Sequence, residues 1–221
     1  MKKLNVLYVA YRDWAKKMLD INYVPENVNI TRISTTEELL QVNHSKYDIL
    51  FFIGWSEIIP DDIVNNNLCI CMHPSPLPKY RGGSPIQHQI LNNETDSAVT
   101  FFIMNSKLDS GDIIWQDDLK LTGNLIYIFK RIITCGMYGI LDIIDMVNNN
   151  TLNDYRIPQD ESQSTIYKRR KPKDSEITIE EITNNSAEYL YNKIRSLQDP
   201  YPNAYITCKD GSKLYITNSH L

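Results

Sequence analysis

One histidine in this 221-residue chain stands where the sequence changes character abruptly. His73 ends the run LCICMH and precedes the loop PSPLPKYRGG, which contains three prolines and two glycines. An imidazole can take up a proton near neutral pH, and a carboxylate beside the ring makes it a better base. A lone histidine at the end of a strand is more often structural than catalytic. The question is therefore whether the chain supplies a partner for this ring.

Two aspartates are candidates for that partner. Asp109 and Asp112 lie in KLDSGDIIWQ, directly after another apolar run. Ligands of open α/β sheets bind beyond the carboxyl ends of the strands, so residues at two such ends are expected to meet. Either carboxylate could hydrogen-bond one nitrogen of His73 and fix its tautomer. Each could equally be a turn residue beside Gly111.

Alternating strand and helix patterns predict a doubly wound α/β fold with a mainly parallel sheet. The expected strands cover residues 3–11, 28–35, 47–54, 68–73, 98–104 and 112–121. The expected helices cover residues 12–22, 35–45, 58–66, 84–93 and 124–150. The helix at 35–45 opens with TTEE, a pattern typical of a helix N-terminus.

The composition becomes polar after residue 150, which predicts three parts. Residues 1–150 are expected to form the catalytic α/β domain, and residues 151–185 a polar surface excursion. Residues 186–221 are expected to form a small tail of one helix and a β-hairpin around Asp210-Gly211. The hairpin could add edge strands across a two-fold axis, so we expect a homodimer through the C-terminal region.

Charge and cysteine content narrow the class of protein. A net charge of −4 argues against a general nucleic-acid binder, and no apolar run is long enough to span a membrane. The few, unevenly spaced cysteines predict free thiols in a reducing compartment: Cys69, Cys71, Cys135 and Cys208. These features predict a cytoplasmic protein.

Three segments together resemble the 10-formyltetrahydrofolate-dependent formyltransferases. They are HPSPLPKYRGGSPIQ, SAVTFFIM and LDSGDIIWQ, in this order. That family places an aspartate 36 residues beyond the histidine, which is the separation of Asp109 from His73. The resemblance implies an enzyme with N10-formyltetrahydrofolate as formyl donor and no metal. It also implies that His73 takes a proton from the attacking amine and that Asp109 orients the ring and stabilises its charge.

The chain departs from the family at one position. The family has an asparagine two residues before the histidine, whereas this chain has Cys71, whose thiol is a weak hydrogen-bond donor. Three interpretations stay open for the oxyanion contact. Protonated His73 or a backbone N–H could replace the missing donor, or a side chain such as Asn105 or Gln87 could compensate. Alternatively, the protein binds its ligands with little or no turnover.

The branch of the family is indicated by segments around this core. YRDWA, YKRRKPKDSEI and LYNKIRSLQDPYPNAY are similar to segments of enzymes that formylate nucleotide-linked amino sugars. This similarity implies a dTDP-linked 4-amino- or 3-amino-dideoxy sugar as substrate, for O-antigen or another surface polysaccharide. Methionyl-tRNA formyltransferases normally add a second domain, for which residues after 204 leave no room. The alternatives are a tRNA- or purine-pathway formyltransferase, or a non-catalytic folate or nucleotide-sugar binding protein.

The resemblance also implies two further groups of site residues. The substrate-binding candidates are Arg12, Lys79, Tyr80, Arg81, Gly82, Gly83, Ser84, Gln87, Tyr167, Arg169 and Arg170. The folate-binding candidates, which include part of the segment FFIGWSEIIP, are Trp55, Ile59, Lys107, Leu108 and Asp112. Structural alternatives remain for several of them. Arg12 could be solvated, residues 79–81 could pin their loop, Ser84 could cap a helix, and residues 168–170 could form a solvated turn.

Overall fold

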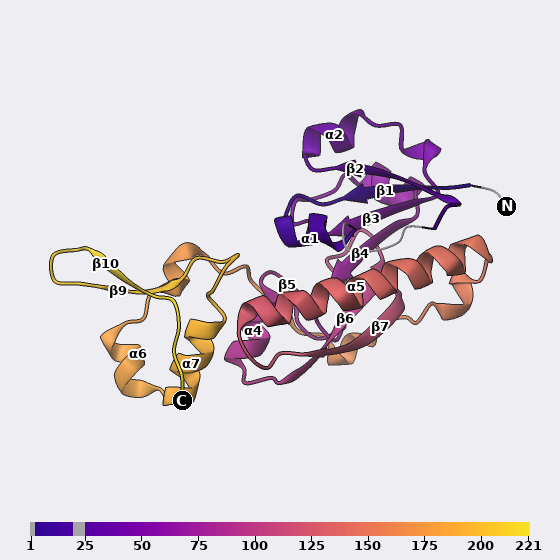
Figure 1. The fold of residues 1–221 in the computed structure, drawn as a ribbon. Coiled ribbons are helices and arrows are strands. Elements are labelled where there is room, and N and C mark those ends of the chain that lie inside the picture. The colour runs from indigo at the N-terminus through magenta and orange to yellow at the C-terminus, as the bar shows by residue number, and fades with distance from the viewer. Residues whose placement is uncertain (1–2, 20–24) are drawn as a thin grey trace.

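A six-stranded sheet forms the centre of the molecule in the computed structural model, which describes residues 3–19 and 25–221 (Figure 1). Its strand order is β2-β1-β3-β4-β6-β7. The strands are β1 Leu4–Val9, β2 Val28–Ile33, β3 Ile49–Ile53, β4 Cys69–His73, β6 Asp96–Ile103 and β7 Ile113–Lys120. The first four are mutually parallel, and β6 and β7 are antiparallel to their neighbours. The predicted doubly wound, mainly parallel sheet is confirmed.

Helices cover both faces of this sheet, which explains why β3 is apolar along its whole length. The apolar cluster on one face includes residues of α1 Asp13–Met18, α4 Pro85–Leu91 and α5 Leu125–Asn148. The cluster on the other face includes residues of α2 Thr36–Gln41 and α3 Asp61–Asn66. The helix expected at 12–22 is described only as far as residue 19, so its residues 20–22, including Ile21, lie outside the described residues. Within the described ranges, no helix is long and apolar enough to cross a membrane.

The start of α2 has the geometry that its sequence predicts. The side chain of Thr35 accepts a hydrogen bond from the backbone N–H of Glu38 at 3.1 Å. The carboxylate of Glu38 accepts in return from the backbone N–H of Thr35 at 3.0 Å. This reciprocal capping box satisfies two donors that the first turn of a helix leaves unpaired.

The direction of β6 corrects one step of the sequence argument. Residue Ile103, at the carboxyl end of β6, pairs with Ile70, whereas His73 pairs with Thr100 near the middle of β6. Because β4 and β6 run in opposite directions, their carboxyl ends lie at opposite ends of the strands. Asp109 lies near His73, but not because two strands end at the same place. It reaches His73 because the loop 104–112 folds back toward the end of β4.

Residues 151–185 contain more regular structure than the sequence predicts. They include β8 Ile166–Tyr167, which pairs in parallel with β5 Arg81–Gly82, and the helix α6 Ile179–Asn184. Thr178 and Glu181 form a capping box at the start of α6, and this Thr-x-x-Glu pattern was a sequence signal for that helix. The excursion is thus tied to the loop that follows His73.

The tail has its own small apolar cluster and lies beside one end of the sheet domain (Figure 1). It contains α7 Ala187–Arg195 and a hairpin of β9 Ala204–Thr207 and β10 Lys213–Ile216, as the sequence predicts. Arg195 of α7 is 6% exposed and donates to the carbonyl oxygens of Leu121 at 2.7 Å and Gly123 at 3.1 Å. This buried guanidinium fastens α7 to the connection between β7 and α5. The homodimer through this tail stays a prediction.

The long helix α5 approaches the sheet closely at Gly139. A Cβ atom on Gly139 would lie 2.5 Å from the ring of Phe101 and 2.9 Å from that of Trp115. The Phe101 ring is fully buried, with its centroid 5.7 Å from that of Trp115. A close-packed interior has no free volume into which these rings could retreat.

Replacing Gly139 by alanine is therefore expected to destabilise the fold. We expect Gly139→Ala to lower the free energy of unfolding by about 1–3 kcal/mol through overpacking. The gain of about 1 kcal/mol that alanine brings to a helix interior offsets part of this cost, so the net loss is expected to reach up to about 2 kcal/mol. Urea unfolding followed by circular dichroism measures the difference.

Gly136 provides a matched control on the same helix. A Cβ atom there would meet the sulfur of Met72 at 2.7 Å and the terminal carbon of Met18 at 2.8 Å. Methionine side chains are flexible and can move aside. Gly136→Ala should therefore change the unfolding free energy by less than about 1 kcal/mol. Equal losses at the two glycines would contradict this account.

Candidate active site

The imidazole of His73 is buried and its tautomer is fixed by the backbone. His73 ends β4, is 6% exposed, and has its Nε2 atom 2.8 Å from the carbonyl oxygen of Tyr80. A carbonyl oxygen can only accept, so Nε2 carries the hydrogen and, in the neutral ring, Nδ1 carries the free lone pair. Of the roles considered for an aspartate, fixing the tautomer is filled instead by the carbonyl oxygen of Tyr80.

The carboxylate of Asp109 faces the free nitrogen of that ring. Its Oδ2 atom lies 3.7 Å from His73 Nδ1, and the Asp109 side chain is 14% exposed. This separation is too long for a hydrogen bond, but it is short enough to stabilise a positive charge on the ring. The same oxygen accepts a hydrogen bond from the backbone N–H of Gly82 at 2.8 Å. The pair can therefore accept a proton at Nδ1 and stabilise the resulting imidazolium.

The backbone around this pair is held in unusual conformations. Tyr80, Ser84 and Asp109 have φ angles of +62°, +55° and +47°, in the left-handed region that favours glycine. Such residues cost on the order of 1–3 kcal/mol each and persist only where their surroundings hold them. All three lie in the two loops that meet beside His73, which marks this region as a candidate site.

Cys71 lies on the same face of β4 as His73, because alternate residues of a strand share a face. Burial, and then the negative charge of Asp109, raise the pKa of the Cys71 thiol well above its usual value. The thiol is therefore neutral near pH 7, and its sulfur lies 3.8 Å from the carbonyl oxygen of Met72. A neutral, weakly donating thiol is a poor nucleophile and a poor oxyanion donor.

The two amide side chains considered as substitutes for the missing asparagine differ in their surroundings. Asn105 is exposed, and its Oδ1 atom accepts from the backbone N–H of Lys107 at 2.9 Å and from the hydroxyl of Ser110 at 3.1 Å. It therefore shapes the loop that carries Asp109. Gln87 is 2% exposed, and its Oε1 atom has no hydrogen-bond partner among the described residues.

A second group of side chains lies where the strand order reverses. Strand β2 lies on one side of β1 and β3 lies on its other side. The carboxyl ends of β1 and β3 therefore form a topological switch point, which is the usual ligand crevice of such sheets. Tyr11 and Trp55 follow these two ends with ring centroids 5.4 Å apart, and the hydroxyl of Tyr11 hydrogen-bonds that of Ser56. The guanidinium of Arg12 lies 5.1 Å from the centre of the Tyr11 ring. Trp55 Nε1 is buried and has no hydrogen-bond partner in the described part of the chain.

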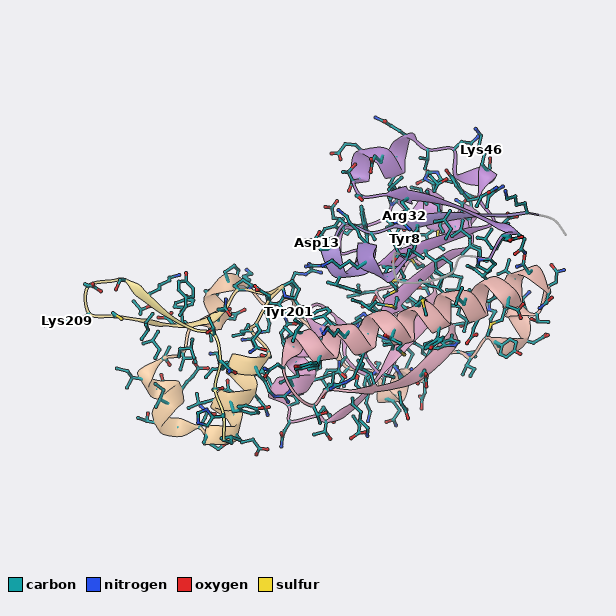
Figure 2. All side chains as sticks on the ribbon, in the orientation of Figure 1. Tyr8, Asp13, Arg32, Lys46, Tyr201 and Lys209 are labelled. Carbon is teal, nitrogen blue, oxygen red and sulfur yellow. The ribbon has the colours of Figure 1, made fainter. Side chains whose placement is uncertain are left out.

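Tyr201, which the sequence analysis did not single out, connects this crevice to the tail. Figure 2 shows it at the junction of the tail with the sheet domain, and its ring centroid is 5.9 Å from that of Phe129 in α5. Burial raises the pKa of Tyr201, whereas Arg12, Gln87 and Arg169 act in the opposite direction. The charges of two cations from distant segments therefore act on one phenol. No pattern in the sequence marks Tyr201 for this position.

In the loop after His73, the side chains of Arg81 and Tyr80 are bound to other parts of the chain. Arg81 is 3% exposed and its guanidinium donates to Gln159 Oε1 and to both carboxylate oxygens of Glu161, at 2.7–3.1 Å. The hydroxyl of Tyr80 donates to Glu94 at 2.8 Å, and its ring stacks on that of Tyr167 with centroids 5.0 Å apart. These contacts match the alternative in which Arg81 pins its loop, and they leave Tyr80 and Tyr167 engaged with each other.

Glycines 82 and 83 allow the excursion to lie against this loop. A Cβ atom would come 2.3 Å from the carbonyl oxygen of Tyr167 at Gly82 and 2.4 Å from the Cα atom of Arg169 at Gly83. The close approach that these glycines permit is therefore to another chain segment. Ser84 makes no side-chain cap to α4, and its hydroxyl instead accepts from the backbone N–H of Arg170 at 3.1 Å.

The remaining candidates fall into three kinds of surroundings. Ile59 is 8% exposed and packs in the apolar cluster, and Asp112 pairs with Arg156 at 2.8 Å. Arg170 is half-buried and its Nη2 atom donates to the carbonyl oxygen of Asp174 at 2.6 Å. The exposed candidates are Lys79, Lys107, Leu108 and Arg169. In the described part of the chain, no three His, Cys, Asp or Glu side chains are grouped to hold a metal ion.

Comparison with known proteins finds a family match over part of the chain. Residues 23–124 match the model of the formyl transferase family. The chain carries a formyl transferase domain. It is 34% identical, over 185 residues, to the methionyl-tRNA formyltransferase of Lysinibacillus sphaericus, an alignment that covers 82% of this chain and 57% of the relative. The chain thus spans a little over half the length of the curated relatives that it matches.

Two solved structures resemble the formyl transferase domain and its tail over nearly their whole length. A methionyl-tRNA formyltransferase from Clostridium thermocellum is 28% identical, with a TM-score of 0.74 over 96% of this chain and 97% of that one. A 4-N formyltransferase from Francisella tularensis is 20% identical, with a TM-score of 0.76 over 98% and 97%. The first of these has a tRNA-related name although this chain covers 97% of it, so chain length alone does not separate the two branches.

The surroundings of the four thiols predict their reactivity with alkylating reagents. Burial raises the pKa of Cys69 and of Cys135 to about 12 and that of Cys71 well above its usual value, while Cys208 is exposed. Only the thiolate reacts, so at about pH 8.5 Cys208 should be modified at least tenfold faster than the other three. Iodoacetamide labelling followed by peptide mass spectrometry measures the four rates. Modification of Cys71 as fast as Cys208 would contradict the neutral thiol described here.

Proposed function

We propose that the protein is an N-formyltransferase that moves a formyl group from N10-formyltetrahydrofolate to the amine of a nucleotide-linked amino sugar. The observation that carries this proposal is the His73–Asp109 pair, which sits at the end of β4 next to the switch-point crevice. The formyl transferase domain supports the reaction type, and the motif resemblance supports the folate donor. The sugar substrate rests on the tail segments, on the similarity to the Francisella 4-N formyltransferase and on the charges of the crevice.

The pair supplies the proton transfers that this reaction needs. A primary amine must lose a proton before or during its attack on the formyl carbon. Nδ1 of neutral His73 takes that proton, since Nε2 is already committed to the carbonyl of Tyr80. The new C–N bond gives a tetrahedral carbon, and the Asp109 carboxylate stabilises the imidazolium beside it. When the bond from carbon to N10 breaks, the proton on Nδ1 passes to that nitrogen, which leaves tetrahydrofolate and the formylated amine.

The neutral state of Cys71 fits the same sequence of steps. The tetrahedral intermediate carries a negative oxygen that needs hydrogen-bond donors aimed at it. A thiolate at this position would repel that oxygen, whereas burial keeps the Cys71 thiol protonated. The positive charge on His73 after proton uptake remains as a group of suitable character, whereas the unpartnered atom of Gln87 is its Oε1, which can only accept a hydrogen bond.

An anionic, partly aromatic substrate fits the crevice. Arg12 and Arg169 form no ion pair with any described residue, although both act on Tyr201. Two uncompensated guanidinium groups are suited to a diphosphate, which arginine binds in a bidentate manner. The rings of Tyr11 and Trp55 offer apolar surface to a nucleotide base. A dTDP-linked 4-amino- or 3-amino-dideoxy sugar has all of these features, and its formylation would serve the synthesis of O-antigen or another surface polysaccharide.

Methionyl-tRNA is the second candidate substrate. The named relatives of this kind have higher sequence identity, 34% and 28%, than the Francisella 4-N formyltransferase at 20%. The basic run at 168–171 would then face the tRNA. The net charge of −4 disfavours this partner, because nucleic-acid binding proteins ordinarily present a large positive surface.

One assay separates the candidate substrates. The protein is incubated with N10-formyltetrahydrofolate and, in parallel, with dTDP- and UDP-linked amino sugars or with charged methionyl-tRNA. We expect mass spectrometry to detect the gain of one formyl group on a dTDP-amino sugar and no formylation without the folate donor. Formylation of methionyl-tRNA alone would assign the second substrate. No product from any amine, with the donor shown to be intact, would leave the protein without the proposed activity.

Removal of the base should then abolish most of the turnover. His73→Ala is expected to lower kcat by about 10²–10⁴, the usual contribution of a positioned general base, with little change in the KM of the donor. His44→Ala is the matched control, since His44 lies in a surface turn and contacts the carbonyl oxygen of Leu39. Steady-state kinetics on both variants checks this. A loss of less than about threefold in His73→Ala would exclude His73 as the base.

A further inference from the structure

The side chain of Gln159 joins three segments at the site. Its Nε2 atom donates to the backbone carbonyl oxygens of Asp109 at 3.0 Å and of Gly111 at 2.7 Å. Its Oε1 atom accepts from Nε and Nη2 of Arg81 at 3.1 and 2.7 Å. The amide thus uses both of its hydrogens and receives two donors, which is its full hydrogen-bonding capacity. No role at the site was expected of it from the sequence.

The loop that Gln159 holds is under geometric constraint. Asp109 has a φ angle of +47°, and a Cβ atom on Gly111 would lie 1.6 Å from the carbonyl oxygen of Ile103. The turn is therefore pressed against the end of β6, and the carbonyl oxygens of Asp109 and Gly111 accept from Gln159. Two hydrogen bonds from one amide satisfy them and fix the turn in this conformation.

Gln159 is in turn held by the loop that follows His73. Arg81 donates to Gln159 and, through two bonds of 2.9 Å, to the carboxylate of Glu161. Arg81 adjoins Gly82, whose N–H binds the carboxylate of Asp109. Gln159 therefore binds the backbone of Asp109 and Gly82 binds its carboxylate, and Arg81 connects these two contacts.

We propose that Gln159 is a positioning residue, which fixes the turn 109–111 so that the Asp109 carboxylate stays opposite Nδ1 of His73. Its effect on catalysis rests on the function proposed above, whereas its effect on the turn does not. A purely structural role would make Gln159 important for the stability of the whole fold. A positioning role makes it important for Asp109 in particular.

The variant Gln159→Glu separates the two halves of the amide. A glutamate retains an oxygen acceptor for Arg81, but it replaces the NH₂ group by an oxygen that faces two carbonyl oxygens. We expect kcat to fall by about 10–100-fold, because misplacement of a catalytic partner by about 1 Å costs up to that much. The KM of the formyl donor should change by less than about twofold. The matched control is Gln163→Glu, the same substitution on the same segment at an exposed side chain with no hydrogen bond to a described residue, which should leave kcat within about twofold.

A double-mutant cycle tests whether Gln159 acts through Asp109. Asp109→Asn removes the charge that Gln159 is proposed to position. In that background, Gln159→Glu should lower kcat by less than about twofold more, because groups that act as a unit are not additive. If the two losses multiply instead, Gln159 acts independently of Asp109 and the proposal is overturned.

A measurement without turnover completes the test. Cys71 shares a face of β4 with His73, and burial and then the charge of Asp109 raise the pKa of its thiol, so displacement of the turn in the neutral variant Gln159→Met should selectively increase its rate of alkylation. The buried thiols of Cys69 and Cys135 report on general loosening and should keep their rates. An unchanged Cys71 rate, or equal acceleration of all three thiols, would overturn the positioning role. This result decides the matter even if no amine is formylated, so failure of the inference and failure of the proposed function remain distinguishable.

Discussion

The carboxylate of Asp109 lies 3.7 Å from the imidazole of His73 and is largely withdrawn from water. Neither group can stay in this arrangement without support, because a buried charge is costly unless other groups bind it. The support is a hydrogen bond from the backbone of Gly82 to the carboxylate and one from the ring of His73 to the carbonyl of Tyr80. Both supports come from the short loop that follows β4. That loop is therefore the element on which the geometry of the site depends.

The antiparallel direction of β6 explains why the loop needs partners elsewhere in the chain. In a fully parallel sheet, the end of β6 would have delivered Asp109 to the same edge as His73. Here the chain must double back from Ile103, and an irregular segment of this kind has carbonyl groups that no strand satisfies. Gln159 satisfies two of them, those of Asp109 and Gly111, and the pairing of β8 with β5 ties the segment of Gln159 to the loop after His73. The excursion is thus a structural part of the site.

Features that depend on residues close together in the sequence could be predicted, whereas features that depend on distant residues could not. Local patterns predicted the α2 cap, the apolar run of β3 and the long helix α5 because neighbouring residues determine them. The motif spacing paired Asp109 with His73, and the structure places Asp112 with Arg156 instead. Tyr201 and Gln159 could not be found in this way. Their positions depend on contacts between residues tens of positions apart, and neither glutamine nor tyrosine in a polar stretch signals a partner.

In the enzyme proposed above, the excursion would couple substrate binding to the proton-transfer pair. Residue Gln159 supports Asp109, while Arg169, ten residues later on the same segment, lies against Gly83 and acts on Tyr201 in the crevice. The pairing of β8 with β5, which lies between Gln159 and Arg169 in the sequence, fixes the alignment of this segment with the loop after His73. A shift of that register would move the cation and the catalytic carboxylate together. In the proposed enzyme, a movement of this segment that changes the binding of an anionic substrate would therefore also displace Asp109 and disturb His73. Glycines 82 and 83, which allow close packing, and the buried Arg81 keep the segment in one alignment.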